Sequence, residues 1–314
     1  MAMVKDLNDR FAIPSALHFE LDQHGMERTI IKTPAAEAII YLQGAHITHY
    51  QPAGAEPVLF LSSKSNFTPG KAIRGGIPII YPWFGSKQDD PTAPMHGFAR
   101  TSQWRVDFAQ PIGDMMQLGF TLVLPHHSNL RFIVTIGPRL NIELRVTNAS
   151  SAPITFEEAF HTYVAVFDVR NAFVQGLAGA TFIDKTDQMQ RKVDEASMVH
   201  LQAETDRVYL NTDSTCRVFD IPAGRCTKII KTSSATTVLW NPWIEKSKKM
   251  SDMGERDWQR MVCIETANAA DNAITLQPDQ THQMSALISA EGFDPITTLA
   301  NRQHSPDLQQ RRAG

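Results

Sequence analysis

Cysteine is scarce in this chain of 314 residues, and its spacing excludes two kinds of protein. The three cysteines, Cys216, Cys226 and Cys263, are an odd number, lie apart and lack C-x-x-C spacing. They can form neither the dense disulfide framework of a small secreted domain nor the paired ligands of a zinc module. We therefore expect ordinary reduced thiols that mostly fill the core.

An excess of positive charge is also missing. The chain has 30 Lys and Arg against 33 Asp and Glu, a formal net charge of −3 at pH 7. A protein that binds nucleic acid by releasing counterions normally carries a basic excess. We therefore expect no nucleic acid as the main partner.

Long apolar segments are absent as well. No segment approaches ~20 uninterrupted apolar residues, and the first residues have no apolar stretch behind a basic region. These absences predict a cytoplasmic protein with no membrane partner, not exported by a signal peptide. The remaining composition, with 42% hydrophobic and 20% charged residues, is that of a folded globular protein.

Apolar and polar residues alternate over much of the chain. The clearest case is 140–147, where every second side chain is apolar, so that one face of a strand meets a core and the other meets water. Similar short runs, many of them bounded by Gly, Pro, Asn or Asp, predict strands at 38–42, 57–61, 104–108, 118–124, 130–136, 216–221, 227–231, 236–240, 261–265 and 284–288. This many strands predict sheets packed on sheets.

Helical periodicity is weak, with short candidates only at 242–249 and 293–301. No linker, repeat or change in composition divides the chain. We expect an all-β fold, a large antiparallel β-sandwich with few short helices, whose two sheets enclose a core about 10 Å thick. The predicted single domain covers residues 1–302, and a polar C-terminal tail covers 303–314.

One stretch combines a basic residue with two glycines. Gly75 and Gly76 permit a positive φ or a close backbone approach, and Arg74 beside them can present a planar fork of donors to an anion. The stretch alone leaves open that Arg74 is a surface residue beside a turn.

Two histidine motifs have spacings found in metal sites. Glu158 and His161 are three residues apart, as are His46 and His49. The neighbouring residues favour strands, on which such pairs point to opposite faces of the sheet. We therefore expect structural roles for His46 and His49, no metal site and no cofactor.

A further candidate is Glu265, which we expect at the end of an apolar strand. Partial burial there would raise the pKa of this carboxyl and make it a better base, unless neighbouring charges offset the effect. The alternative is a surface glutamate. Trp240, Trp243 and Trp258 lie in the same part of the sequence, where their flat faces could either fill a core or stack on a sugar ring.

Taken together, six motifs in order along the chain resemble the aldose 1-epimerase (mutarotase) superfamily, and within it most closely the glucose-6-phosphate 1-epimerase branch. The motifs are Arg74-Gly-Gly-Ile-Pro78, His96-Gly-Phe-Ala-Arg100, Phe160-His-Thr-Tyr163, Glu204-Thr-Asp-Arg-Val-Tyr209, Trp240-Asn-Pro-Trp243 and Cys263-Ile-Glu265. The resemblance covers about residues 30–290. It implies a large galactose-mutarotase-like β-sandwich with its active site in a concave cleft of one sheet.

The resemblance also implies roles for single residues. It places the catalytic base at Glu265 and the catalytic acid at His161. The implied substrate-binding residues are His96 and Asp206 for the sugar and Arg74 and Arg100 for a 6-phosphate, with Gln88, Tyr163 and Asn241 as further lining residues.

The implied reaction interconverts the α and β anomers of a hexose 6-phosphate, with glucose 6-phosphate favoured. One base removes the O1 proton and one acid protonates the ring oxygen, and each positioned proton transfer contributes ~10²–10⁴-fold. The expected partner is the small hexose phosphate, and a monomer is the simplest oligomeric state. Two alternatives stay open: an epimerase of unphosphorylated sugars, and a carbohydrate-binding β-sandwich without catalysis.

Overall fold

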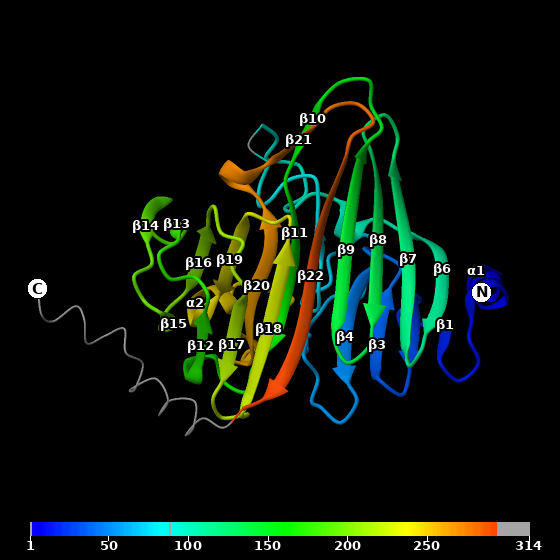
Figure 1. Cartoon of the computed structure of the whole chain (residues 1–314), viewed down its shortest axis with the longest axis horizontal. Helices are drawn as coiled ribbons and strands as arrows, with labels where there is room; N and C mark the ends of the chain where they lie inside the picture. Colours follow the sequence, from blue (N-terminus) through cyan, green and yellow to red (C-terminus); the bar gives the residue numbers. More distant parts are fainter. Residues whose placement is uncertain (1, 88, 294–314) are drawn as a thin grey trace, which may run out of the picture.

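The computed structural model describes residues 2–87 and 89–293, and antiparallel strands dominate it. A nine-stranded sheet, in the order β15-β12-β17-β18-β22-β9-β8-β7-β6, forms the front layer in Figure 1. Its strands are β6 (Arg105–Ile112), β7 (Met115–Leu124), β8 (Ser128–Ile136), β9 (Leu140–Asn148), β12 (Ala172–Gln175), β15 (Met198–His200), β17 (Cys216–Asp220), β18 (Arg225–Thr232) and β22 (Thr281–Gly292).

The second layer lies behind the first in Figure 1 and contains two sheets. The seven-stranded one has the order β14-β13-β16-β19-β20-β11-β5, and the four-stranded one the order β1-β2-β3-β4. Their strands are β1 (Leu17–Leu21), β2 (Glu27–Lys32), β3 (Ala36–Tyr41), β4 (His46–Pro52), β5 (Ile79–Ile80), β11 (Glu158–Ala165), β13 (Thr181–Asp184), β14 (Gln190–Val193), β16 (Thr205–Tyr209), β19 (Thr236–Asn241) and β20 (Met261–Asn268). A separate pair joins β10 (Ile154–Phe156) to β21 (Ile274–Leu276).

The segment 76–78 connects the two sheets of the second layer. On one side, the Ile77 amide donates to the Ile47 carbonyl of β4 at 2.9 Å. On the other, the carbonyls of Gly76 and Pro78 each accept an amide hydrogen bond from β11 at 3.0 Å. Gly76 has φ +63°, and a Cβ there would lie 2.1 Å from the Ile47 carbonyl oxygen. Only glycine therefore allows the backbones to approach this closely.

The alternating patterns become the two faces of strands. Within residues 140–147 of β9 the apolar residues are buried and the others partly or fully exposed, as predicted. Strands β11 and β20 differ, because nearly all their side chains are buried on both faces. One face packs into the core between the layers, and the opposite face is covered by other segments. This doubly covered part of the sheet is where buried polar side chains gather.

Most predicted strands are confirmed, but the strand predicted at 57–61 is wrong. This segment makes only isolated bridges, Leu59 to Val164 and Leu61 to Gly75. Successive amides of Val58, Phe60 and Ser62 donate to carbonyls of three different segments. Because it has no single neighbour, the segment crosses between elements and does not join a sheet.

Helices are few and short, as predicted, although one was missed. Helix α1 (Ala2–Phe11) packs Val4, Leu7 and Phe11 against the core, and this spacing was a signal in the sequence. Helix α2 (Trp243–Ser247) confirms the helix predicted within 242–249. The other helical segments of the described residues are short 3₁₀ helices: η1 (Ala99–Thr101), η2 (Val169–Asn171), η3 (Asp257–Arg260) and η4 (Ala270–Asn272).

No helix within residues 2–87 and 89–293 is long and apolar enough to cross a membrane. The helix predicted at 293–301 and the tail predicted at 303–314 lie outside the described residues, except for Phe293. The division into one domain and a tail stays a prediction. All three cysteines are free and buried, as expected.

Candidate active site

His161 and Glu265 face each other across two neighbouring strands. The register of β11 and β20 pairs these two residues directly, and His161 Nε2 lies 3.4 Å from Glu265 Oε1. Both side chains are buried, with the residues 6% and 1% exposed. His161 Nδ1 and Glu265 Oε2 have no hydrogen-bond partner among the described residues. The pair therefore holds unused polar atoms beside a cavity.

That cavity has a volume of about 320 Å³ and lies over the seven-stranded sheet. It contains six of the predicted site residues, together with seven others, among them Trp240, whose role the sequence left open. The lining residues are Arg74, Phe84, Gly85, Met95, His96, Arg100, His161, Lys185, Asp206, Trp240, Lys246, Met250 and Glu265. Sequence positions from 74 to 265 thus converge on one hollow of the size of a small-molecule site.

Asn241 does not line this cavity, and its predicted role in substrate binding is corrected. Its side chain is fully buried and donates to the carbonyls of Trp258 and Met261, each at 2.8 Å. Successive residues of a strand point to opposite faces. Because Trp240 faces the cavity, Asn241 faces away from it. Of the other two residues predicted as further lining, Tyr163 is not among the residues that line the cavity, and Gln88 lies outside the described residues.

Arg74 is held by three polar contacts. Its Nε and Nη2 lie 3.1 and 3.0 Å from Asp252 Oδ2, and its Nη1 donates to the Tyr163 hydroxyl at 2.9 Å. Burial lowers the pKa of Arg74, but Tyr163 and Asp252 outweigh this and raise it. Three of the five guanidinium N–H groups are thus engaged, which leaves two for an anion.

Arg100 lies on η1 and has fewer hydrogen-bond partners than Arg74. Its Nη2 donates to the Met95 carbonyl at 2.6 Å, whereas its buried Nε has no partner among the described residues. Burial, and next the positive charge of Arg74, lower the pKa of Arg100 to about 10, so it is still charged at neutral pH. A partly buried cation with an unpaired buried donor favours binding of an anion.

His96 is fixed by a tight turn next to the pair. Its φ is +66°, and its Nδ1 accepts a hydrogen bond from the Gly85 amide at 3.2 Å. The neutral ring therefore carries its proton on Nε2. Its ring lies edge-on to that of His161 at 5.8 Å between centroids. At the next residue, Gly97, a Cβ would lie 2.0 Å from the Tyr81 carbonyl, which explains the glycine.

Asp206 also lines the cavity and lies close to two lysines. Lys185 Nζ is 3.9 Å from its Oδ1 and Lys246 Nζ is 3.8 Å from its Oδ2. Burial raises the pKa of Asp206 despite these two positive charges. Neither lysine was predicted, because no motif marks them; Lys185 follows a strand and Lys246 lies on α2 among other charged residues.

Of the tryptophans, only Trp240 lines the cavity. Trp243 packs against Trp258 with 4.7 Å between ring centroids, and Trp83 Nε1 donates to the Pro94 carbonyl. Tyr163 stacks on His161 at 4.7 Å, so it supports the pair and connects it to Arg74.

The two motifs with the spacing of metal sites make other contacts. Glu158 is paired with His282, 2.9 Å away, on the face opposite to His161, and buried His46 contacts the Gly75 carbonyl oxygen at 2.7 Å. Among the described residues, no three His, Cys, Asp or Glu side chains are grouped to hold a metal ion.

Burial disfavours charge on both members of the pair. Burial raises the pKa of Glu265 well above its usual value, as the sequence predicted, and the nearby negative charge of Asp206 adds to the effect. Burial lowers the pKa of His161 well below 6.5, and electrostatic interactions with His96, Arg74 and Arg100 act in the same direction. Glu265 lies within β20 and not at its end, so the burial is more complete than expected. Burial therefore disfavours both the imidazolium form of His161 and the carboxylate form of Glu265.

A sequence profile of the family described as aldose 1-epimerase matches residues 27–289. The chain belongs to the aldose 1-epimerase family. All thirteen lining residues fall within the matched region.

Individual members of the aldose 1-epimerase family resemble the chain over most of its length. A protein of Cenchrus ciliaris named "Putative glucose-6-phosphate 1-epimerase" is 32% identical over 284 residues, which are 85% of each chain. A protein of Escherichia coli with the same name is 32% identical over 82% of this chain and 88% of its own. A crystal structure of a "putative mutarotase" from Salmonella typhimurium has a TM-score of 0.83 at 27% identity, covering 92% of this chain and 99% of that one. These relatives confirm the predicted family and the mutarotase-like β fold.

Substituting Glu265 by Gln should stabilise the protein in a pH-dependent manner. Because the pKa of Glu265 is raised in the folded state, folding takes up a proton that the unfolded chain has lost above about pH 4.5. This penalty grows as the pH rises, by at most about 1.4 kcal/mol per pH unit, up to the folded pKa. Urea unfolding should therefore show Glu265→Gln more stable than wild type at pH 7, and the gain should shrink towards pH 4.5. The control Glu195→Gln, at an exposed position, should show no such trend.

Proposed function

We propose that this protein is a glucose-6-phosphate 1-epimerase, which interconverts the α and β anomers of hexose 6-phosphates. The observation that carries the proposal is the 3.4 Å approach of His161 and Glu265 in a cavity that also contains Arg74 and Arg100. An acid and a base in contact suit a reaction that moves two protons, and two arginines suit a phosphate. The names of the relatives support the same substrate class.

In the proposed reaction the pyranose ring opens and closes again. Glu265 takes the proton of the anomeric hydroxyl O1 while His161 gives a proton to the ring oxygen O5, so that the C1–O5 bond breaks and an aldehyde forms. Rotation about the C1–C2 bond exposes the other face of C1. O5 then attacks C1 as His161 takes its proton back and Glu265 returns one to O1. No atom is gained or lost, and no redox step occurs.

The protonation states of the pair fit this sequence. A neutral His161–Glu265 pair contains as many protons as the imidazolium and carboxylate that start the reaction, so moving one proton from Glu265 to His161 converts one into the other. The charges of Arg74 and Arg100 oppose a proton on His161. A phosphate dianion bound to both arginines would reduce this repulsion and favour the reactive state.

The two arginines would bind the phosphate from one side of the cavity. Arg74 keeps two free N–H groups, and Arg100 keeps its unpaired Nε. His96 and Asp206 remain to hold sugar hydroxyls, with His96 donating through Nε2 and Asp206 accepting. Trp240 offers an apolar face to the ring.

Turnover should require both members of the pair. We expect Glu265→Gln and His161→Asn each to lower kcat for glucose 6-phosphate at least about 100-fold, with a modest change in KM. The measurement is the polarimetric decay of pure α-glucose 6-phosphate, with free glucose as the second substrate. Equal rates on both sugars would point to an epimerase of free sugars, and binding without any acceleration would point to a carbohydrate-binding protein.

Loss of either arginine should mainly weaken binding of the phosphorylated sugar. Each charge-assisted contact contributes roughly 1.5–3 kcal/mol, so Arg74→Ala and Arg100→Ala should each raise KM for glucose 6-phosphate by about 10- to 100-fold. Arg191→Ala is the matched control, because Arg191 is paired with Asp271 at the surface. An unchanged KM in both variants would contradict the assignment of the phosphate site.

A further inference from the structure

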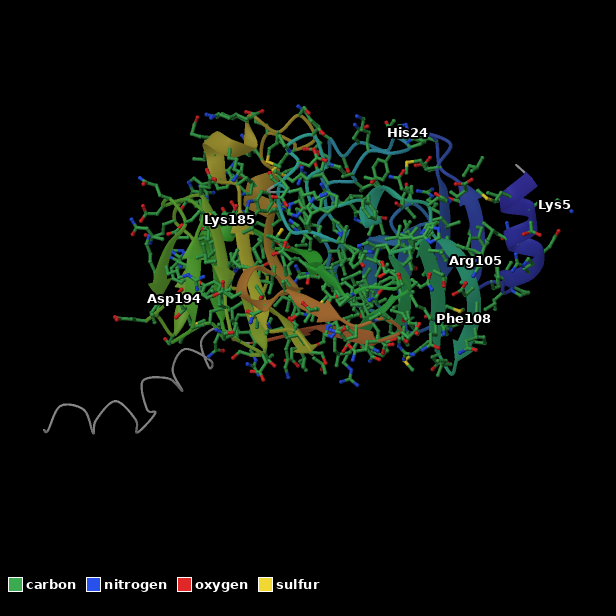
Figure 2. The ribbon with its side chains drawn as sticks, turned by 90° about the horizontal axis from the view of Figure 1, so that it is seen from above. Lys5, His24, Arg105, Phe108, Lys185 and Asp194 are labelled. Carbon is green, nitrogen blue, oxygen red and sulfur yellow. The ribbon has the colours of Figure 1, made fainter. Side chains whose placement is uncertain are left out.

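Lys185 enters the cavity from a turn whose geometry is fixed by hydrogen bonds. The turn follows β13, where Asp184 Oδ1 accepts hydrogen bonds from the Thr186 amide and hydroxyl. The Lys185 amide donates to the Asp206 carbonyl at 2.9 Å, which ties the turn to β16. In Figure 2, Lys185 is labelled at the end of the molecule opposite to Lys5 of helix α1. The backbone thus places Lys185 next to Asp206.

The side chain of Lys185 lies between the two walls of the cavity. Its Nζ is 4.8 Å from the centre of the Phe84 ring on one wall and 3.9 Å from Asp206 Oδ1 on the other. The side chain is 27% exposed, so its charge is only partly screened by water. The distance to Asp206 exceeds a hydrogen bond, and the ammonium group therefore keeps donors for a bound molecule.

The other cations of the cavity are already engaged, or would be engaged by a phosphate. Arg74 is paired with Asp252, and Lys246 Nζ lies 2.8 Å from Glu204. Arg100 has no carboxylate partner within ion-pair range among the described residues. Once a phosphate dianion binds both arginines, their positive charge is largely neutralised. Lys246 is shared between Glu204 and Asp206. Lys185 has no second carboxylate partner among the described residues, so it is then the cation available to balance the partly buried Asp206 and the buried Glu265.

We propose that Lys185 is a positioning residue for the reaction, whose ammonium charge favours the ionised forms of Glu265 and Asp206 while the arginines hold the phosphate of the substrate. This inference rests on the proposed function. The titratable and charged groups around Glu265 are His161 and Tyr163 on β11, Cys263 on β20, Asp206 on β16, Arg100 on η1 and Lys185 itself.

The electrostatic balance at Glu265 supports this role. Burial, and next Asp206, raise the pKa of Glu265, while Lys185 and Arg100 act in the opposite direction. Lys185 also lowers the pKa of His96 and opposes the rise in the pKa of Asp206. The charge of Lys185 therefore acts on the base, Glu265, and on both sugar-binding groups, His96 and Asp206.

The test is the pH dependence of kcat, which reports the ionisation of the enzyme–substrate complex. For Lys185→Met we expect the acid limb of the kcat profile on glucose 6-phosphate to move upward by roughly one pH unit. Lys185→Arg should restore the wild-type limb, because it restores the charge. Lys248→Met removes an exposed lysine paired with Glu245 at the surface, and its limb should stay in place.

A fall in kcat of Lys185→Met at every pH without a shift of the limb would overturn the inference, as would an unchanged profile. Lys185→Gln serves the same purpose if the Met variant does not fold. A second measurement does not need activity: the ¹³C resonance of the Glu265 carboxyl, identified by its loss in Glu265→Gln, should titrate at higher pH in Lys185→Met than in wild type. No difference between them would refute the role of Lys185. Absence of turnover in the wild type would instead refute the proposed function.

Discussion

The pairing of β11 with β20 is the constraint on which the site depends. Their antiparallel register sets His161 against Glu265, and the same register continues through β19 to β16, where Asp206 lies. A shift of one residue in either strand would turn one member of the pair to the opposite face of the sheet. Hydrogen bonds along these strands, and not a flexible loop, therefore determine the distance between acid and base.

This arrangement has an energetic cost that the rest of the fold must offset. Burying His161 and Glu265 disfavours their charged forms, and atoms of both remain without hydrogen bonds among the described residues. The sandwich offsets the cost with a continuous apolar core between its layers. Strained or unpaired groups at a site, held by a well-packed scaffold, are the usual pattern in enzymes.

The cavity brings positive and negative side chains together. The lysines lie 3.9 and 3.8 Å from Asp206, and the two arginines line the same cavity as the acid–base pair. Arg74 forms hydrogen bonds with Asp252 and with the Tyr163 hydroxyl. The Tyr163 ring in turn stacks on His161. A change in the charge at Arg74 is thus transmitted to the imidazole over two contacts. Binding and chemistry share one electrostatic field in this pocket.

The sequence by itself determined the all-β class, most of the strands and the motif residues, because alternation of apolar and polar side chains is a local property of the chain. It also predicted a strand at 57–61 and a cavity role for Asn241, and the structure corrected both. The hydrogen-bond partners of a segment and the direction of a side chain depend on residues that are distant in the sequence. Lys185 and Lys246 carry no local signal. Only the tertiary structure decided that they face Asp206, because strand register brings together residues far apart in sequence.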